Sequence, residues 1–260
     1  MEIAQFLETL DREGQLLAAA AGQAGSEAKV PTCPDWQVRD LLRHTGMVHR
    51  WATAFVAERH TSYQPDAGLP DLDGDELLTW FREGHRRLVD TLAAAPPDTE
   101  CWSFMPAPSP LAFWARRQAH ETAVHRVDAE SALGTGSSGV GTDLAAIGTN
   151  SSPVATDFAL DGIDELLGGF HNRGKSKVRS EEPRTLRVRA TDAEDAAWTV
   201  RLSPEPPVIE QGADGHVDCE LVGPADQLYL SLWNRRPFPE VTGDAEVAAL
   251  WRETSAVTWN

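Results

Sequence analysis

The segment Trp114 to Glu130, W-A-R-R-Q-A-H-E-T-A-V-H-R-V-D-A-E, constrains this chain more than any other. Glu121 and His125 are four residues apart, so on a helix they lie on one face, about one turn from each other. Asp128 extends the same row by three further residues. Such polar groups on a core-facing stripe are costly unless something binds them. The segment therefore predicts a helix that supplies ligands to a metal site, which a residue from elsewhere completes.

His120 directly precedes Glu121, which invites comparison with the zinc-protease motif H-E-x-x-H. Here the spacing is H-E-x-x-x-H, so His120 and His125 are about 140° apart around a helix and cannot both ligate one ion in that manner. Glu121 and His125 can. One further histidine would give a two-histidine, one-glutamate set with a vacant position, which is typical of catalytic zinc.

The alternative for this helix is a buried salt-bridge network without metal. In that network Glu121 and Asp128 would be paired by arginines of the same helix, Arg116, Arg117 or Arg126. Spacing alone leaves both interpretations open.

A second predicted helix follows the prolines of V-P-T-C-P-D-W, with Asp35 as its expected N-cap. Its residues Leu41, His44, Val48, Trp51 and Phe55 form one row at helical spacing, and His49 flanks that row. Periodicity therefore does not choose between His44 and His49 as the third ligand.

Two more helices are expected in the N-terminal part, over residues 2–20 and after the acidic run Asp71–Glu76. That run is not a calcium loop, because its glycine is at the fourth position and no glutamate closes it. In the helix that follows, His85 points inward as a hydrogen-bonded core residue. With the segment 111–132, four helices predict a four-helix bundle, a fold that builds metal sites from facing helices.

The character of the chain changes after a Gly/Ser/Thr-rich stretch at 133–152. This stretch contains G-T-G-S-S-G, which we interpret as linker rather than a dinucleotide loop, because no strand precedes it. Beyond it, a helix-like segment ending in glycines leads to three alternating segments that predict strands, T-L-R-V-R-A-T, A-W-T-V-R-L-S and H-V-D-C-E-L-V-G. A helix from Pro224, a short strand near Val241 and a last helix, Ala245–Glu253, complete it. We therefore expect an α+β protein with domains at 1–152 and 153–260.

Composition limits the partners. The formal charge of −17 argues against nucleic acid and against an anionic membrane surface. No stretch approaches the ~18 apolar residues of a membrane span, and the N-terminus lacks the pattern of a signal peptide. The three cysteines Cys33, Cys101 and Cys219 form neither a disulfide framework nor a C-x-x-C pair, and we expect them to be packing residues. The expected location is the cytoplasm.

Three segments resemble the mycothiol-dependent maleylpyruvate isomerase family: C-P-D-W-Q-V-R-D-L-L-R-H-T-G, A-R-R-Q-A-H-E-T-A-V-H-R-V-D-A-E and A-L-D-G-I-D-E-L-L. The later run G-P-A-D-Q-L-Y-L-S-L-W-N-R-R-P is similar to the C-terminal domain of that family. The resemblance implies a DinB-like bundle followed by a sterol-carrier-like domain. It also implies that His44, Glu121 and His125 bind a divalent metal, zinc above all, and it selects His44 over His49.

The same resemblance implies a reaction. Metal bound by these ligands would lower the pKa of the thiol of mycothiol, so that a thiolate exists at neutral pH. Addition of the thiolate to a small electrophile, followed by bond rotation and thiol expulsion, gives a cis–trans isomerase. Retention of the adduct gives an S-transferase. Arg235 matches a functional arginine of the family that would bind a substrate carboxylate, although it can equally be a solvated surface residue.

Two other functions remain open at this point. The chain could be a non-enzymatic protein that holds an apolar ligand in its C-terminal domain, or a DinB-like hydrolase that uses metal-bound hydroxide without a thiol. For the enzyme we expect mycothiol and a small electrophile as partners, and a monomer or small homo-oligomer. Asp128 is expected to orient a metal-bound histidine.

Overall fold

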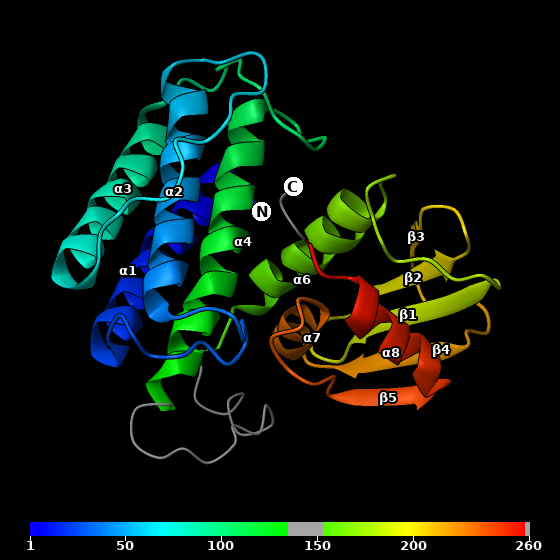
Figure 1. Ribbon diagram of the computed structural model, residues 1–260. Coiled ribbons are helices and arrows are strands. Elements are labelled where there is room, and N and C mark those ends of the chain that lie inside the picture. Colours follow the sequence, from blue (N-terminus) through cyan, green and yellow to red (C-terminus); the bar gives the residue numbers. More distant parts are fainter. Residues whose placement is uncertain (135–152, 258–260) are drawn as a thin grey trace. The chain divides into compact units, whose positions relative to one another are not determined.

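The structure, a computed structural model, describes residues 1–134 and 153–257. The chain divides into two compact units, Met1–Ser151 and Ser152–Asn260. Helices make up the described part of the first unit, and the second combines a mixed sheet with helices, which confirms the α+β class (Figure 1). The predicted linker beyond Gly134 lies outside the described residues.

Four long helices build the described part of the first unit, residues 1–134, as the sequence predicts. They and the short 3₁₀ turn after the last of them are α1 (Ile3–Ala24), α2 (Val38–Ala57), α3 (Gly74–Ala94), α4 (Pro110–Ser131) and η1 (Ala132–Gly134). The start of α4 is set by Ser109, whose hydroxyl accepts a hydrogen bond from the backbone N–H of Ala112, and by Pro110 in the first turn. With the helix beginning there, Glu121 and His125 lie in its middle.

Helix α2 runs parallel to α3. Arg39 near the start of α2 pairs with Asp73 ahead of α3, and Arg50 further along donates to the carbonyl oxygen of Trp80 at 2.7 Å. Such a parallel pair needs a long return, which residues 58–73 provide (Figure 1). Because α3 is thus packed on α2, the opposite flank of α2 is left for α4.

Helix α4 is antiparallel to α2 and parallel to α1. The ring of Phe55 near the end of α2 stacks on Trp114 near the start of α4, whereas His44 near the start of α2 meets Glu121 further along α4. Eighteen of the 22 residues of α4 are buried, so its polar side chains must find partners within the protein.

The start of α2 differs from the prediction. Gln37, not Asp35, is the N-cap, and it forms a capping box with Asp40. Before the helix begins, the chain turns back on itself, because the backbone N–H groups of Cys33 and Trp36 donate to the carbonyl oxygens of Val30 and Cys33. Asp35 is part of this turn and therefore cannot cap the helix.

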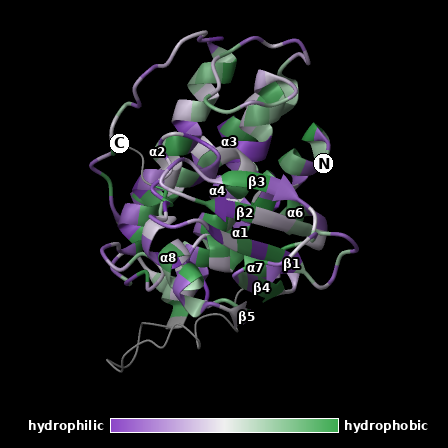
Figure 2. Cartoon of the chain, turned by 90° about the vertical axis from the view of Figure 1, so that its right-hand side faces the viewer, coloured by the Kyte–Doolittle hydropathy of each residue, from purple (hydrophilic) through white to green (hydrophobic). Residues whose placement is uncertain are grey.

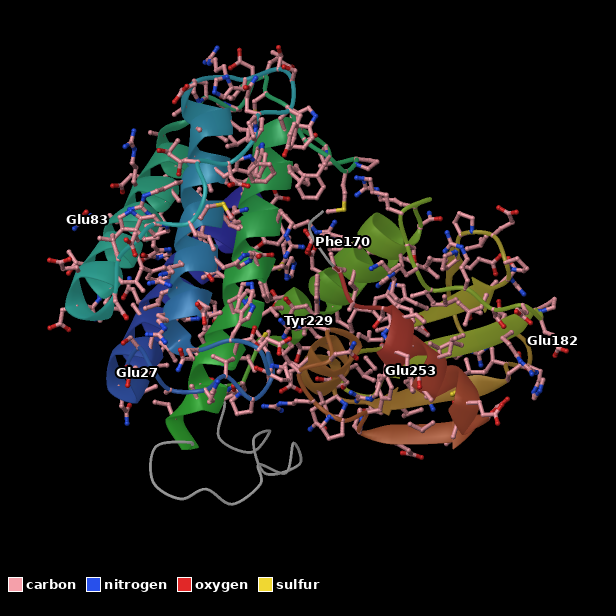
Figure 3. The ribbon with its side chains drawn as sticks, viewed as in Figure 1. Glu27, Glu83, Phe170, Glu182, Tyr229 and Glu253 are labelled. Atoms are coloured by element: carbon pink, nitrogen blue, oxygen red, sulfur yellow. The ribbon has the colours of Figure 1, made fainter. Side chains whose placement is uncertain are left out.

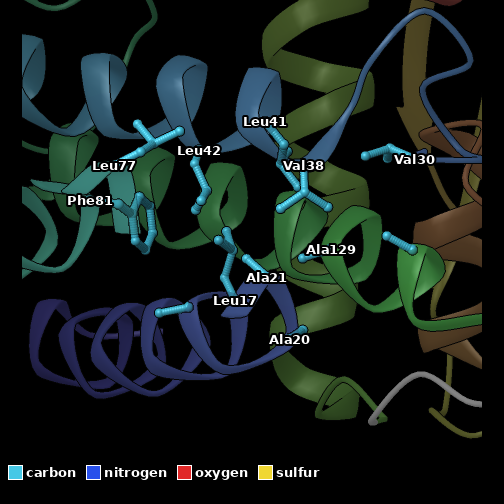
Figure 4. Packing of buried hydrophobic residues seen from close by; sticks show 12 residues of the cluster. Leu17, Ala20, Ala21, Val30, Val38, Leu41, Leu42, Leu77, Phe81 and Ala129 are labelled. Carbon is cyan, nitrogen blue, oxygen red and sulfur yellow. The ribbon is translucent and has the colours of Figure 1, made fainter. Parts of the chain in front are cut away.

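Apolar side chains fill the centre of the bundle. The cluster in Figure 4 joins α1, α2, α3 and α4 through small and branched residues. Its larger members are Leu17, Val38, Leu41, Leu77 and Phe81, each 0% exposed. Coloured by hydropathy, the helices show apolar residues interleaved with polar ones rather than uniformly apolar surfaces (Figure 2). Glu83 of α3, by contrast, is exposed and points away from the bundle (Figure 3).

The second unit is a five-stranded sheet with helices. Its elements are α6 (Thr156–Asp164), the π-helical turn η2 (Glu165–His171), β1 (Arg184–Ala190), β2 (Ala197–Leu202), β3 (Val208–Gln211), β4 (Cys219–Gly223), α7 (Ala225–Leu232), β5 (Glu240–Gly243) and α8 (Ala245–Thr254). The strand order is β3-β2-β1-β4-β5, with β1 and β4 parallel and the other pairs antiparallel. Helices α7 and α8 pack against the central strands.

The predicted strands at β1, β2, β4 and β5 are confirmed, and two features were not predicted. Strand β3 is a short edge strand after a proline-rich turn, with none of its residues buried, so it lacks the alternation that marks a strand. The glycines Gly168 and Gly169 do not end the helix as expected. The helix continues through them as a π-helical turn to His171.

No helix in the described ranges is both long and apolar enough to cross a membrane.

Candidate metal centre

Three side chains from two helices converge on one point of the bundle. His44 of α2 and His125 of α4 place their Nε2 atoms 3.3 Å and 3.2 Å from the same oxygen, Oε1 of Glu121. One ligand atom from each of the three residues lies within 4.8 Å of the other two. The motif of α4 and the histidine of α2 that the sequence analysis selected are therefore brought together.

The spacing of these atoms can be compared with that around a metal ion. Zinc bonds of ~2.0–2.2 Å to nitrogen and oxygen in a tetrahedral site separate neighbouring ligand atoms by roughly 3.3 Å. The two Nε2–Oε1 distances of 3.3 Å and 3.2 Å are of that size. Two imidazoles and one carboxylate are also ligands that zinc prefers. The residues present therefore fit a divalent metal with one position left for a further ligand.

Glu121 provides the negative charge of the cluster. Burial by itself would raise the pKa of this carboxyl, but hydrogen bonds from His125 and His44 and the nearby charge of Arg117 hold the pKa well below its usual range. Arg117 contacts the other oxygen, Oε2, at 3.2 Å. Oε1 is thus the oxygen that faces both histidines, and the carboxylate is ionised at neutral pH.

His125 is held from both sides. Its Nδ1 atom lies 2.8 Å from Oδ2 of Asp128, which is buried, and its Nε2 atom faces Glu121. Burial would lower the pKa of His125, yet the hydrogen bonds to Asp128 and Glu121 outweigh it and raise the pKa to about 9. A ring that donates from Nδ1 to a carboxylate directs its Nε2 atom toward the cluster, which is the arrangement of metal-binding histidines in general.

The salt-bridge alternative is realised in part. Arg117 pairs with Glu121, as that alternative requires, whereas Arg126 points to α1 and pairs with Glu13 and Glu130, each at 2.7 Å. The ion pair of Arg117 uses the oxygen of Glu121 that is not shared by the histidines. The network and the cluster of ligand atoms therefore coexist.

The two histidines of α2 occupy different surroundings. His49, at 0% exposure, belongs to the core, where its Nε2 atom is 2.9 Å from the hydroxyl oxygen of Thr122. His44 is at the edge of the bundle with 18% of its side chain exposed. On α2, His44 therefore lies at the flank of the buried face, and His49 lies nearer its centre. Burial and its neighbour His85 lower the pKa of His49 well below its usual range.

Other predicted residues are located as follows. His120 is buried on another side of α4, against Phe6, and takes no part in the cluster. His85 is a buried residue whose Nε2 atom lies 3.3 Å from the carbonyl oxygen of Asp11, as predicted. Arg235, in the second unit, donates from Nη1 to the carbonyl oxygen of Trp233 at 2.7 Å.

The cysteines are all free, and Cys101 and Cys219 are buried, in agreement with packing roles. Cys33 is different. It is half-buried, and its Sγ atom lies 3.6 Å from Oδ2 of Asp128. Nothing in the spacing of the cysteines indicated this contact, because it joins residues 95 positions apart.

The turn before α2 contributes groups that the sequence analysis did not single out. The ring of Trp36 lies 5.0 Å from that of His44 and stacks on that of His125 at 5.9 Å. The hydroxyl of Thr32 donates to Oδ1 of Asp128 at 2.6 Å. The segment C-P-D-W of this turn resembles the family pattern, but no periodicity relates a turn to a helix so distant in the chain.

Fold and site together define a class of protein: a helical bundle with a candidate centre of two histidines and one carboxylate, joined to a mixed α+β unit. Residues 7–130 match the family model of the mycothiol maleylpyruvate isomerase N-terminal domain, and residues 157–250 match that of the MDMPI C-terminal domain. The chain therefore belongs to the mycothiol-dependent maleylpyruvate isomerase family, whose name implies a mycothiol-dependent isomerase. Comparisons with curated proteins and with solved structures gave no match.

Proposed function

We propose that this protein is a metal-dependent enzyme that uses mycothiol to attack a small electrophile. The proposed metal ligands are His44, Glu121 and His125, and the proposed metal is zinc. The observation that carries this proposal is the approach of both Nε2 atoms to one carboxylate oxygen at 3.2–3.3 Å. A divalent metal bound there would lower the pKa of a coordinated thiol, so that a thiolate nucleophile is present at neutral pH.

The side chains around the cluster prepare it for a cation. The ionised Glu121 gives the site one negative charge, and Arg117 limits the carboxylate to presenting Oε1. Asp128 accepts from Nδ1 of His125 and so leaves Nε2 as the atom that faces the site. His44, partly exposed, is on the side from which a thiol and a substrate can approach.

The proposed reaction is addition of the thiol to an activated double bond, after which bond rotation and expulsion of the thiol yield the trans isomer. An S-transferase would stop at the adduct. We further propose that Arg235 binds a carboxylate of the electrophile, because the guanidinium fork matches a carboxylate bidentately. If so, Arg235→Lys raises KM for a substrate with a carboxylate more than it lowers kcat, and Arg201→Lys on the exposed side of the sheet changes neither.

Metal analysis tests the ligand assignment. The purified wild-type protein is expected to carry about one zinc ion per chain, and His44→Ala and Glu121→Ala are expected to lose it. His60→Ala is the matched control, since His60 belongs to the same unit but lies outside the cluster. Full metal retention in either ligand variant would refute the assignment.

A second measurement tests the thiol. Cobalt is substituted for zinc, and mycothiol is titrated while the visible absorption of the cobalt is followed. Coordination of the thiol predicts a new sulfur-to-cobalt band. An unchanged spectrum with metal bound would instead favour a hydrolase that uses metal-bound hydroxide. A purified protein with an apolar ligand and no metal would favour a binding function.

A further inference from the structure

Backbone hydrogen bonds hold the turn between α1 and α2 in one conformation. The N–H of Val30 donates to the carbonyl oxygen of Trp36 at 3.1 Å, and the N–H of Val38 donates to that of Ala28 at 2.9 Å. Within these bonds, Cys33 donates to Val30 and accepts from Trp36. Val30 is 0% exposed and belongs to the core cluster of the bundle. The turn is therefore a defined structural element that can hold a side chain in a fixed place.

Thr32 extends from this turn to the end of α4. Its hydroxyl donates to Oδ1 of Asp128 at 2.6 Å and lies 3.2 Å from the hydroxyl oxygen of Ser131. Ser131 in turn donates to the backbone carbonyl of Asp128 at 2.6 Å. The side chain of Asp128 is 0% exposed. A buried carboxylate needs donors on both oxygens to stay in one rotamer, and Thr32 supplies one of them.

The other oxygen of Asp128 serves His125. Oδ2 accepts from Nδ1 of the imidazole at 2.8 Å and also lies 3.6 Å from Sγ of Cys33. The carboxylate of Asp128 thus links the turn, through Thr32 and Cys33, to the proposed ligand His125. A rotation of the carboxylate that loses Thr32 also moves Oδ2, and with it the plane of the imidazole.

We propose that Thr32 is a positioning residue of the metal centre, which acts through Asp128 to set the orientation of His125. This inference rests on the proposed ligand set and assigns a role to a turn that contributes no ligand. The ring of Trp36, stacked on that of His125, limits the same imidazole from its face. The same turn therefore restrains His125 in two ways: Thr32 acts on its Nδ1 atom through Asp128, and the ring of Trp36 packs against its face.

The test removes the hydroxyl without changing the volume. Thr32→Val deletes the donor, Thr32→Ala deletes it with less steric demand, and Thr32→Ser restores it. Zinc affinity is measured by competition with a chromophoric chelator, and the cobalt forms are compared by visible absorption. Loss of a group that orients a metal ligand typically weakens metal affinity about 10–100-fold. We expect a zinc affinity about tenfold weaker and shifted cobalt bands in Val and Ala, and near wild-type values in Ser.

Thr53→Val is the matched control. Thr53 is a buried threonine of α2 whose hydroxyl donates only to the backbone carbonyl of His49 among the contacts described. The same chemical change there can lower stability but is expected to leave zinc affinity and the cobalt spectrum unchanged. Melting temperatures of the metal-free forms separate a general loss of stability from an effect on the centre.

The outcomes distinguish this inference from the proposed function. If the wild-type protein binds no zinc, or His44→Ala binds it as tightly, the ligand set itself is wrong. If the wild-type protein binds zinc, His44→Ala loses it, and both Thr32→Val and Thr32→Ala retain wild-type affinity and spectrum, the ligand set stands and the role of Thr32 is refuted. A zinc affinity of Thr32→Ser as weak as that of Thr32→Val would also refute the role of Thr32.

Discussion

The guanidinium of Arg126 lies 2.7 Å from the carboxylate of Glu13, and neither side chain is more than 3% exposed. The pair joins two parallel helices, α4 and α1, in the interior of the bundle. Removal of one partner of a buried pair leaves the other charge in an apolar environment, which costs about 3 kcal/mol or more. This buried pair therefore contributes to holding α1 against α4.

Glu13→Gln tests that relationship. We expect the free energy of unfolding to fall by about 3 kcal/mol, measured by urea denaturation, because Arg126 keeps its charge but retains only Glu130 among the partners described above. The control is Glu210→Gln, which breaks the exposed pair with Arg201 and is expected to have no measurable effect. Equal denaturation midpoints for the two variants would contradict the prediction.

Gly14 allows close packing of α1 against His85. A Cβ atom at this position would lie 2.2 Å from Cε1 of the imidazole, so Gly14→Ala should destabilise the protein by about 1–3 kcal/mol despite the better helix propensity of alanine. Gly22→Ala on the same helix is the matched comparison. There the nearest atom is the flexible Cδ2 of Leu78 at 3.2 Å, so thermal unfolding should show little loss or a gain. A stabilised Gly14→Ala variant would show that His85 can move aside.

His171 makes the stability of the second unit sensitive to acid. Its ring is buried against Trp251, and burial lowers the pKa of His171 to about 4 from a usual value near 6.5. The folded state therefore binds fewer protons than the unfolded state between these values. Stability from this group is complete above pH 6.5 and is lost as the pH falls toward 4, by about 2 kcal/mol at pH 5.

The variant His171→Asn tests this dependence. Its amide can still hydrogen-bond Ser176, which lies 3.1 Å from Nδ1 of the histidine, but it does not titrate. Melting temperatures measured from pH 7.5 to pH 4.5 should fall more steeply for the wild-type protein than for the variant. Parallel curves for the two proteins would count against the buried neutral histidine.

Removal of bound metal should lower the melting temperature of the wild-type protein, and this effect should be lost when Glu121 is replaced. A ligand that binds only the folded state stabilises it by about 2.7 kcal/mol at a concentration 100 times its Kd. We expect zinc to raise the melting temperature of the metal-free wild-type protein and to leave that of Glu121→Gln unchanged, because the amide is a much weaker ligand than the carboxylate. Equal zinc-induced shifts in both proteins would argue that zinc binds elsewhere.

Local patterns predicted the four N-terminal helices, and they indicated two of the proposed ligands, because such signals are short-range. The four-residue spacing of Glu121 and His125 is a property of one helix, and the cap and proline at Ser109 and Pro110 start it. The choice of His44 over His49 did not come from periodicity, which favoured neither, but from resemblance to a family. In the structure the two histidines differ in burial, which depends on how α3 and α4 cover α2.

What the sequence did not predict depends on contacts between distant segments. Thr32 and Cys33 meet Asp128 across 96 and 95 residues, and a turn has no periodicity that reveals its partner. Strand β3 owes its existence to pairing with β2, since none of its own residues is buried. The expected cap at Asp35 failed for the same reason: backbone bonds from Val30 to Trp36 decide where the helix can begin.

His44 and Glu121 are 77 residues apart along the chain, so a metal ion held by both would contribute to folding as well as to chemistry. Glu121 and His125 approach each other in any helical state of their segment, but His44 joins them only after α2 has docked on α4. An ion held by all three would act as a cross-link that closes this long loop, and the entropy of loop closure grows with loop length. Metal occupancy would then report on the native topology of the bundle, and the rate of metal uptake by refolding protein would time the docking of these two helices.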